Sequence, residues 1–195
     1  EVLRGEARNV NALRLLGTCA AHAGRQREAE RLLRQAVAQA PDYAEAQLDL
    51  GRVLKEQQRL EEAIAQFEKA IELEPGNFQG HFLLASVLAP AARSYDAIDA
   101  YRKVLELRPK HPGAWLGLGH MLKTVGRQDE AIEAYRECIR LKPGNGEIYW
   151  SLANLKTYRL SDADIEEIEA QLRQEPDADD PGTQSRVNFQ FALAK

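Results

Sequence analysis

Four prolines recur along this sequence at one constant interval. Pro41, Pro75, Pro109 and Pro143 are spaced 34 residues apart. At fixed distances before each proline the sequence repeats an alanine, then a bulky residue, then a small residue, and no insertion shifts the register. Self-similarity at a period of this size is typical of arrays in which each unit buries its apolar face by stacking on its neighbours. The sequence therefore predicts a repeat array rather than a domain built around one central core.

Each repeat contains two stretches with the periodicity of an amphipathic helix. In the first stretch of one repeat, Trp115, Leu118 and Leu122 recur at i, i+3 and i+7, which places them on one helical face. Gly119 adds almost no side chain, so we expect the two helices of this repeat to approach closely, with Tyr135 filling the space beside them. The repeated prolines are expected to end the second helix, because proline has no amide hydrogen and cannot continue a helix.

A Leu-Gly or Leu-Ala pair occurs in the same register within the first helix of every repeat. Together these positions resemble the signature of the tetratricopeptide family. The resemblance implies an all-α fold, a right-handed superhelical solenoid of antiparallel helix pairs, which binds a protein or peptide and does not itself catalyse. It comprises four full repeats, at residues 10–43, 44–77, 78–111 and 112–145.

The third repeat departs from the pattern at the end of its first helix. Pro90 falls in the last turn of that helix, and Ala92 stands where Gly24 and Gly126 mark a left-handed turn in two other repeats. We expect the helix to stop early or to kink there. Two interpretations remain open: the proline changes the local shape of a binding groove, or it is a proline tolerated at a helix end.

The repeat decays at both ends of the sequence. Residues 1–9 are interpreted as the end of a truncated preceding repeat. Residues 146–174 are interpreted as a divergent fifth repeat, in which an N-cap at Ser161 starts a second helix without the usual alanine and aromatic. Residues 175–195 are predicted to form a linker and a capping or bridging helix, since capping repeats are commonly atypical.

Three stretches near the C-terminus carry a second, narrower resemblance. Residues 115–127, 146–158 and 189–195 are similar to the region that joins the array to the catalytic domain in bacterial tetratricopeptide–sulfotransferase proteins. The resemblance implies a parent protein that transfers sulfate from PAPS to a tyrosine or another hydroxyl. These 195 residues contain no phosphate-binding strand-loop-helix pattern. We therefore assign them no catalytic residue and no cofactor, and PAPS belongs to the implied catalytic domain.

The tetratricopeptide resemblance also implies which residues face a partner. The first helix of each repeat lines the concave face, and its second, fifth, ninth, twelfth and thirteenth positions point into the groove. The candidate partner-binding residues are Asn11, Arg14, Thr18, His22, Arg52, Lys55, Gln79, Phe82, Ser86, His120, Lys123, Trp150, Asn154 and Tyr158.

Basic and aromatic side chains are mixed within this candidate groove. Its arginines, lysines and His120 lie on one face of a protein whose net charge is −4, with Phe82, Trp150 and Tyr158 among them. Arginine and aromatic side chains are enriched in interface hot spots. We therefore expect a partner segment that is acidic or contains tyrosine. The alternative for Trp150 and Tyr158 is that they pack against the predicted cap at 161–195.

Composition argues against several other classes of protein. The net charge of −4 does not suggest a nucleic-acid partner, and no apolar run approaches the roughly 20 residues that span a bilayer. The N-terminal residues lack the pattern of a signal peptide, so we expect a cytoplasmic protein. Cys19 and Cys138 are expected to be buried thiols rather than a disulfide. The sequence does not indicate the oligomeric state.

No group of residues has the spacing of a catalytic or metal-binding site. The four histidines form no HExxH pair, and no Cys/His cluster has zinc-ligand spacing. We expect His81 in the core of its repeat, His120 as a hydrogen-bonding group in the groove, and carboxylate pairs such as Glu166-Glu167 on solvated faces. Two functions remain: the partner-binding region of a sulfotransferase, or a free-standing scaffold for the assembly of protein complexes.

Overall fold

The computed structural model of the chain describes residues 9–155, 158–173 and 182–194, and regular secondary structure in these ranges is entirely α-helical. The helices are α2 (Val10–His22), α3 (Gln26–Gln39), α4 (Ala44–Glu56), α5 (Leu60–Leu73), α6 (Phe78–Leu88), α7 (Ser94–Leu107), α8 (Pro112–Thr124), α9 (Gln128–Leu141), α10 (Gly146–Ala153), α11 (Asp162–Arg173) and α12 (Gly182–Leu193). The all-α prediction is confirmed. The chain divides into two compact units: unit 1 ends at Leu107 and contains α2–α7, and unit 2 begins at Arg108 and contains α8–α12.

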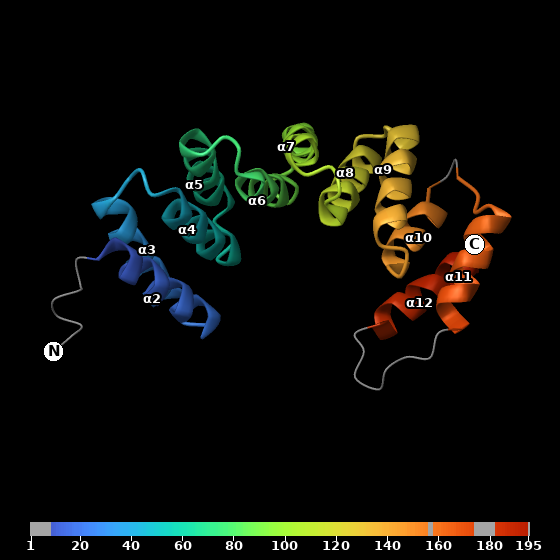
Figure 1. The fold of residues 1–195 in the computed structure, drawn as a ribbon, viewed down its shortest axis with the longest axis horizontal. Coiled ribbons are helices and arrows are strands. Elements are labelled where there is room, and N and C mark those ends of the chain that lie inside the picture. The colour runs from blue at the N-terminus through green and yellow to red at the C-terminus, as the bar shows by residue number, and fades with distance from the viewer. Residues whose placement is uncertain (1–8, 156–157, 174–181, 195) are drawn as a thin grey trace. The chain divides into compact units, whose positions relative to one another are not determined.

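Successive helices pack as pairs within each unit (Figure 1). In unit 1, α2 packs on α3, α4 on α5 and α6 on α7, and the second helix of a pair also contacts the first helix of the next. In unit 2, α8 packs on α9 in the same way. The pairs coincide with the four predicted repeats. Their buried side chains therefore lie between neighbouring helices, as expected for stacked repeats.

Glycine in the first helix allows the two helices of a pair to approach closely. A Cβ atom at Gly51 would lie 2.5 Å from Cε1 of Phe67, and one at Gly119 would lie 2.6 Å from Cε1 of Tyr135. Both rings are completely buried. The predicted close approach at Gly119 is confirmed, since a side chain there would have to displace a core aromatic ring.

A side-chain hydrogen bond holds the start of the first helix in three repeats. Six residues after the repeat proline, a side chain donates to the proline carbonyl oxygen. These pairs are Gln47 with Pro41 at 3.0 Å, His81 with Pro75 at 3.0 Å, and Trp115 with Pro109 at 2.8 Å. His81 is half-buried, and its Nε2 makes this hydrogen bond, so the expectation that His81 lies in the core of its repeat was wrong. Tyr149 occupies the same position after Pro143, but its buried hydroxyl has no partner among the described residues.

Helix α6 stops early, as predicted for the third repeat. It has 11 residues, whereas α2, α4 and α8 each have 13, and it ends at Leu88, shortly before Pro90. Ala92 then adopts a φ of 59°, close to the 74° of Gly24 and the 82° of Gly126. A residue with a Cβ atom in this left-handed region costs roughly 1–2 kcal/mol. The third repeat therefore keeps the turn geometry of the first and fourth repeats without their glycine, as the second repeat does with Gln58 at a φ of 60°.

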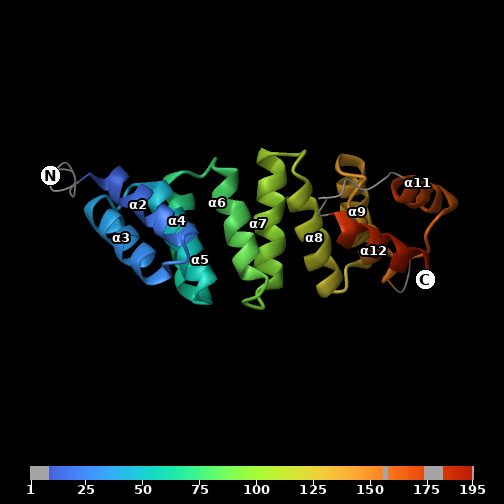
Figure 2. The same ribbon diagram turned by 90° about the horizontal axis from the view of Figure 1, so that it is seen from below.

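The main neighbour of α10 in unit 2 is α12 rather than α11. The sequence suggested that the helix after Ser161 would pair with the first helix of the fifth repeat, and the structure differs on this point. Helices α10 and α12 meet at Gly146, where a Cβ atom would lie 2.1 Å from the backbone oxygen of Ser185. Figure 2 shows α11 and α12 at the C-terminal end of this unit. One buried core joins α10, α11 and α12, formed by Tyr149, Ile168, Phe189 and Ala192.

The two cysteines differ in their surroundings. Cys138 is buried, and its thiol donates to the carbonyl oxygen of Pro112 at 3.1 Å. Burial raises the pKa of the Cys138 thiol to about 11. Cys19 is exposed, so the expectation of two buried thiols was wrong for this residue.

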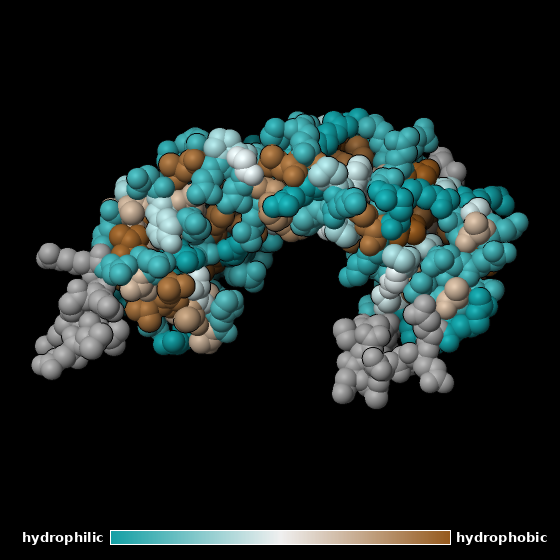
Figure 3. Space-filling model, viewed as in Figure 1, coloured by the Kyte–Doolittle hydropathy of each residue, from teal (hydrophilic) through white to brown (hydrophobic). Residues whose placement is uncertain are grey.

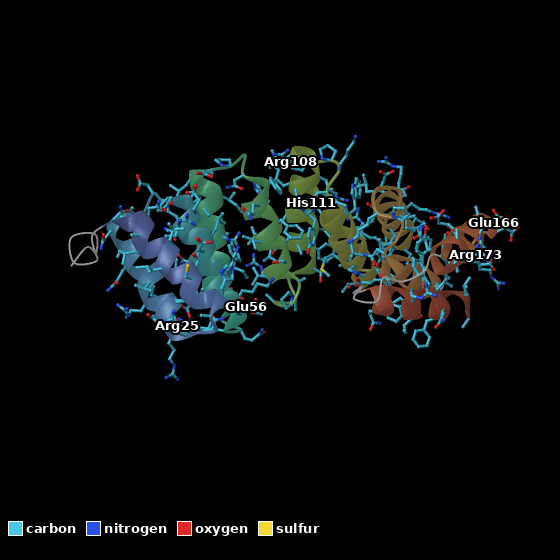
Figure 4. All side chains as sticks on the ribbon, turned by 60° about the horizontal axis from the view of Figure 1, so that its bottom comes forward. Arg25, Glu56, Arg108, His111, Glu166 and Arg173 are labelled. Atoms are coloured by element: carbon cyan, nitrogen blue, oxygen red, sulfur yellow. The ribbon has the colours of Figure 1, made fainter. Side chains whose placement is uncertain are left out.

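Within the described ranges, no helix combines the length and apolar character needed to cross a bilayer. The same ranges contain no cluster of three or more His, Cys, Asp or Glu residues placed to hold a metal ion. Glu166 is exposed on α11 (Figure 4), in agreement with the solvated face expected for it.

Candidate peptide-binding groove

Side chains of α2, α4 and α6 in unit 1 border a groove with a volume of about 550 Å³. Four of the predicted partner-binding residues line it: Thr18, His22, Arg52 and Lys55. Asp49, Glu56 and Leu83 also contribute to the lining. This surface, called the α2–α4–α6 groove below, is the part of the predicted binding face that the structure brings together in unit 1.

Two arginines share one buried carboxylate at the edge of this groove. Arg14 donates from Nη1 to Oδ2 of Asp49 at 2.8 Å, and Arg52 donates from Nη1 to Oδ1 at 2.5 Å. Asp49 is only 6% exposed, and Arg14 also donates from Nε to the hydroxyl of Tyr43 at 3.0 Å. Burial acts to lower the pKa of Arg14, but its bonds to Asp49 and Tyr43 outweigh this and raise it. The Arg14–Asp49–Arg52 cluster therefore carries one net positive charge and links the first two repeats.

Lys55 is the cation of the groove with the fewest partners. Its Nζ donates to Oγ of Ser86 at 2.9 Å, and Ser86 in turn donates to the carbonyl oxygen of Leu83 at 2.8 Å. Among the described residues, no carboxylate lies within ion-pair distance of Lys55. Its ammonium group is held by a neutral hydroxyl and keeps its charge available for an anion.

The groove as a whole is weakly basic. Within its lining, the positive charges of Arg52 and Lys55 balance the negative charges of Asp49 and Glu56, and Arg14 at its edge adds one positive charge. Figure 4 shows Glu56 at the C-terminal end of α4. The predicted cluster of positive charge is thus reduced to one net charge in unit 1, because the prediction did not include the pairing with Asp49.

The remaining predicted residues of unit 1 lie beside the groove and are not part of its lining. Asn11 accepts a hydrogen bond from the Tyr43 hydroxyl at 3.2 Å, which supports Arg14 indirectly. The ring of Phe82 packs edge-on against Tyr101, with centroids 6.0 Å apart. Gln79 is exposed in the first turn of α6, where its backbone amide donates to the Asn77 side chain. These contacts are those of structural residues around the groove.

In unit 2 the predicted residues belong to α8 and to the region of α10. Nδ1 of His120 lies 2.9 Å from the hydroxyl of Tyr135, and its Nε2 lies 3.6 Å from Oε1 of Glu147. Burial lowers the pKa of His120, so its imidazole is neutral at pH 7. Trp150 is 42% exposed, and Asn154 donates from its side chain to the Trp150 carbonyl oxygen at 2.8 Å. Lys123 forms no ion pair or hydrogen bond within the described ranges, and its side chain is half-buried.

Tyr158 packs with the C-terminal helices, which was one of the two alternatives for it. Its hydroxyl donates to Oδ2 of Asp164 at 2.6 Å and also accepts a hydrogen bond from Arg136. Arg136 donates to Oδ1 of Asp164 at 2.5 Å, and the Ser161 backbone and hydroxyl donate to Oδ2 at 2.8 Å each. Burial acts to raise the pKa of Asp164, but these hydrogen bonds hold it below its usual range. Tyr158 is therefore part of a polar cluster between α9 and α11.

Asp49 is the groove residue that sequence reasoning missed. It is the sixth residue of its repeat, beside the positions that were expected to face the groove, and it lies three residues before Arg52. Its spacing of 35 residues from Arg14 is one repeat plus one residue. A search for acidic residues one repeat plus one residue away from each candidate cation would have found the pair.

Comparisons with known proteins agree with this architecture. Two tetratricopeptide-repeat family profiles match the chain, at residues 20–87 and 112–145. One similar solved structure is YrrB, described as a TPR protein with an unusual peptide-binding site. It is 18% identical with a TM-score of 0.74, and the match covers 99% of this chain and 94% of that one. MamA is 22% identical with a TM-score of 0.73, over 97% and 92% of the two chains. A thermophilic TPR protein of Thermus thermophilus, TTC0263, is 20% identical with a TM-score of 0.66, over 95% and 100%.

The structural matches establish the fold alone, because the sequence identity to each of the three proteins is low. Comparison with curated protein sequences finds no significant match. The two profile matches carry the same description, and together they span more than half of the chain. They fall on helix pairs whose spacing, close contacts and turns repeat every 34 residues. The chain therefore belongs to the tetratricopeptide-repeat family.

Proposed function

We propose that this protein is an interaction scaffold that binds an extended segment of a partner protein in the α2–α4–α6 groove. The observation that carries the proposal is a preformed groove that, together with Arg14 at its edge, has one net positive charge. In it, Lys55 has only a hydroxyl as its partner and Arg52 shares its carboxylate with Arg14. Side chains already fixed by hydrogen bonds lose little conformational entropy when a ligand binds.

An acidic segment fits this groove best. A carboxylate placed between Lys55 and Arg52 would receive charge-assisted hydrogen bonds, each contributing about 1.5–3 kcal/mol. The apolar side chain of Leu83 and the methyl group of Thr18 offer contact to an aromatic ring, which supports a tyrosine next to the acidic residue. Glu56 would disfavour a second carboxylate at its own end of the groove.

The parent protein on this proposal is a PAPS-dependent sulfotransferase, and the repeats present the acceptor segment to its catalytic domain. This rests on the resemblance of residues 115–127, 146–158 and 189–195 to bacterial tetratricopeptide–sulfotransferase proteins. A cytoplasmic location belongs to the same proposal. The test is the gene sequence that follows Lys195: a strand-loop-helix with a phosphate-binding loop is expected, and its absence would leave a free-standing assembly scaffold as the function.

Fluorescence anisotropy tests the groove itself. A labelled dodecapeptide with one tyrosine between acidic residues should bind, and its counterpart with lysine in place of each acid should not. Lys55→Ala should weaken binding about tenfold, corresponding to the loss of one charge-assisted hydrogen bond. The matched control is Lys103→Ala on α7, where the lysine forms an exposed ion pair with Glu106 at 2.7 Å. Equal affinities for the two peptides, or equal effects of the two substitutions, would refute the assignment of the groove.

A further inference from the structure

Unit 2 contains a second groove, with a volume of about 670 Å³, between α10 and α12. Glu147 and Trp150 line it from α10, at i and i+3. Gln184, Asn188 and Phe191 line it from α12, at i, i+4 and i+7. These spacings place each set on one face of its helix, so two helical stripes border the groove. We call this surface the Trp150 groove.

The core beneath the Trp150 groove fixes the spacing of its two walls. The rings of Tyr149 and Phe189 pack with centroids 5.5 Å apart, and both residues are almost completely buried. At the start of α10, Gly146 brings the backbones of the two helices into direct contact near Ser185. The groove is therefore formed before any ligand arrives, which lowers the entropic cost of binding.

Two large aromatic side chains of this groove remain exposed. Trp150 is 42% exposed and Phe191 is 58% exposed. In the described part of unit 2, the only other exposed large apolar side chain is Leu193, which lies on the same helix as Phe191. Figure 3 shows hydrophilic residues over most of the visible surface, with separate hydrophobic patches between them. Tryptophan is the residue type most typical of interface hot spots. An apolar side chain seated between Trp150 and Phe191 would cover both rings.

The polar part of the lining indicates the charge and form of the ligand. Among the described residues of the lining, Glu147 is the only one with a charged side chain, and burial lowers the pKa of the nearby His120 imidazole, so His120 does not offset this charge. Gln184 donates from Nε2 to Oδ1 of Asn188 at 3.2 Å. This leaves the Gln184 carbonyl oxygen and the Asn188 amide hydrogens for the backbone of a bound segment.

We propose that the Trp150 groove binds a segment of a partner protein in which a large apolar side chain stands next to a Lys or Arg. The apolar side chain inserts between Trp150 and Phe191, and the cation pairs with Glu147. The chain's own residues 174–181 carry four carboxylates and no cation, so their charge does not suit this site. The charge preference is opposite to that of the α2–α4–α6 groove, and each site can therefore be tested without the other.

The test uses the 195-residue protein and two matched pools of labelled dodecapeptides. One pool has a fixed Phe-Arg core, the other a fixed Phe-Glu core, and both are randomised elsewhere. We expect enrichment from the Phe-Arg pool to be lost with Trp150→Ala, whereas enrichment from the Phe-Glu pool reports the α2–α4–α6 groove and should survive that substitution. In anisotropy titrations of the enriched Phe-Arg peptides, Trp150→Ala and Phe191→Ala should each weaken binding at least tenfold. Glu147→Gln should weaken it a few-fold and reduce the preference for arginine over glutamate.

Two controls keep these outcomes decisive. Tyr95→Ala removes an aromatic side chain that is 66% exposed on α7 of unit 1, and it should leave binding unchanged. Circular dichroism should show that each variant retains its helices, as expected for exposed positions. Loss of Phe-Glu enrichment with Trp150→Ala, or unchanged binding of the Phe-Arg peptides by Trp150→Ala and Phe191→Ala, would overturn the proposal. A concentration-dependent dimer that Trp150→Ala dissociates in sedimentation experiments would also overturn it, because the occupant would then be a second copy.

Discussion

Gly146→Ala should weaken the attachment of α12 to α10. The new Cβ atom would lie 2.1 Å from the backbone oxygen of Ser185 and 2.9 Å from its carbonyl carbon. An ordinary contact between carbon and oxygen is about 3.3 Å, so the two helices would have to separate by roughly 1 Å. Overpacking of this kind costs about 1–3 kcal/mol, and the better helix propensity of alanine returns up to about 1 kcal/mol. The net expectation is a loss of about 1–2 kcal/mol.

Hydrogen exchange of the α12 backbone amides is the assay, because it reports on local opening. A loss of about 1.4 kcal/mol corresponds to about tenfold faster exchange at α12, while α2 to α5 in unit 1 should not change. The matched control is Gly144→Ala, only two residues away, where the nearest atom to a new Cβ would be Oε1 of Gln171 at 3.5 Å. If both substitutions left exchange at α12 unaltered, the close contact at Gly146 would not be what holds α12.

Three further predictions concern single residues. Ala92→Gly should stabilise the protein by about 0.5–1 kcal/mol, because the left-handed φ of 59° costs alanine more than glycine loses in unfolded-state entropy; a lower urea midpoint would contradict this. Ellman's reagent should label the exposed Cys19 in the native protein and Cys138, with its pKa of about 11, only after denaturation; rapid labelling of two thiols would contradict the burial. The pKa of Asp164 is lower in the folded protein than its value of about 3.9 in the unfolded chain, so ionised Asp164 stabilises the fold above that pH. This stabilisation is lost as the pH falls through the pKa of the folded protein. Asp164→Asn should therefore lower the urea midpoint at pH 7 and flatten its fall below pH 4.

The repeat itself could be predicted because its determinants are local and recur. The contact between Gly119 and Tyr135 joins residues of one helix pair, and the same spacing of a small and a bulky residue is readable in four copies. The early end of α6 follows from Pro90 alone, because a missing amide hydrogen has the same effect in any context. Features of this kind do not depend on where other repeats lie.

The electrostatics of the binding face could be predicted only in part. Arg14 and Arg52 were both predicted to face a partner, but the carboxylate that they share comes from a position next to those examined. The prediction counted charges along the face, whereas the field that a ligand meets depends on how these charges are paired. A pairing across neighbouring repeats can be read only once their relative register is fixed in three dimensions.

The end of the array was the hardest part to read, since α11 and α12 both carry apolar side chains and either could have covered α10. Ile165, Ile168 and Leu172 satisfy the helical period, but periodicity indicates that a helix buries a face without specifying against what. The residue that discriminates is Gly146, which starts α10 without a side chain and so admits the backbone of α12. This choice of neighbour also creates the second groove, because α12 carries Phe191 alongside Trp150. Gly146, the first residue after the four full repeats, therefore determines whether unit 2 has the Trp150 groove.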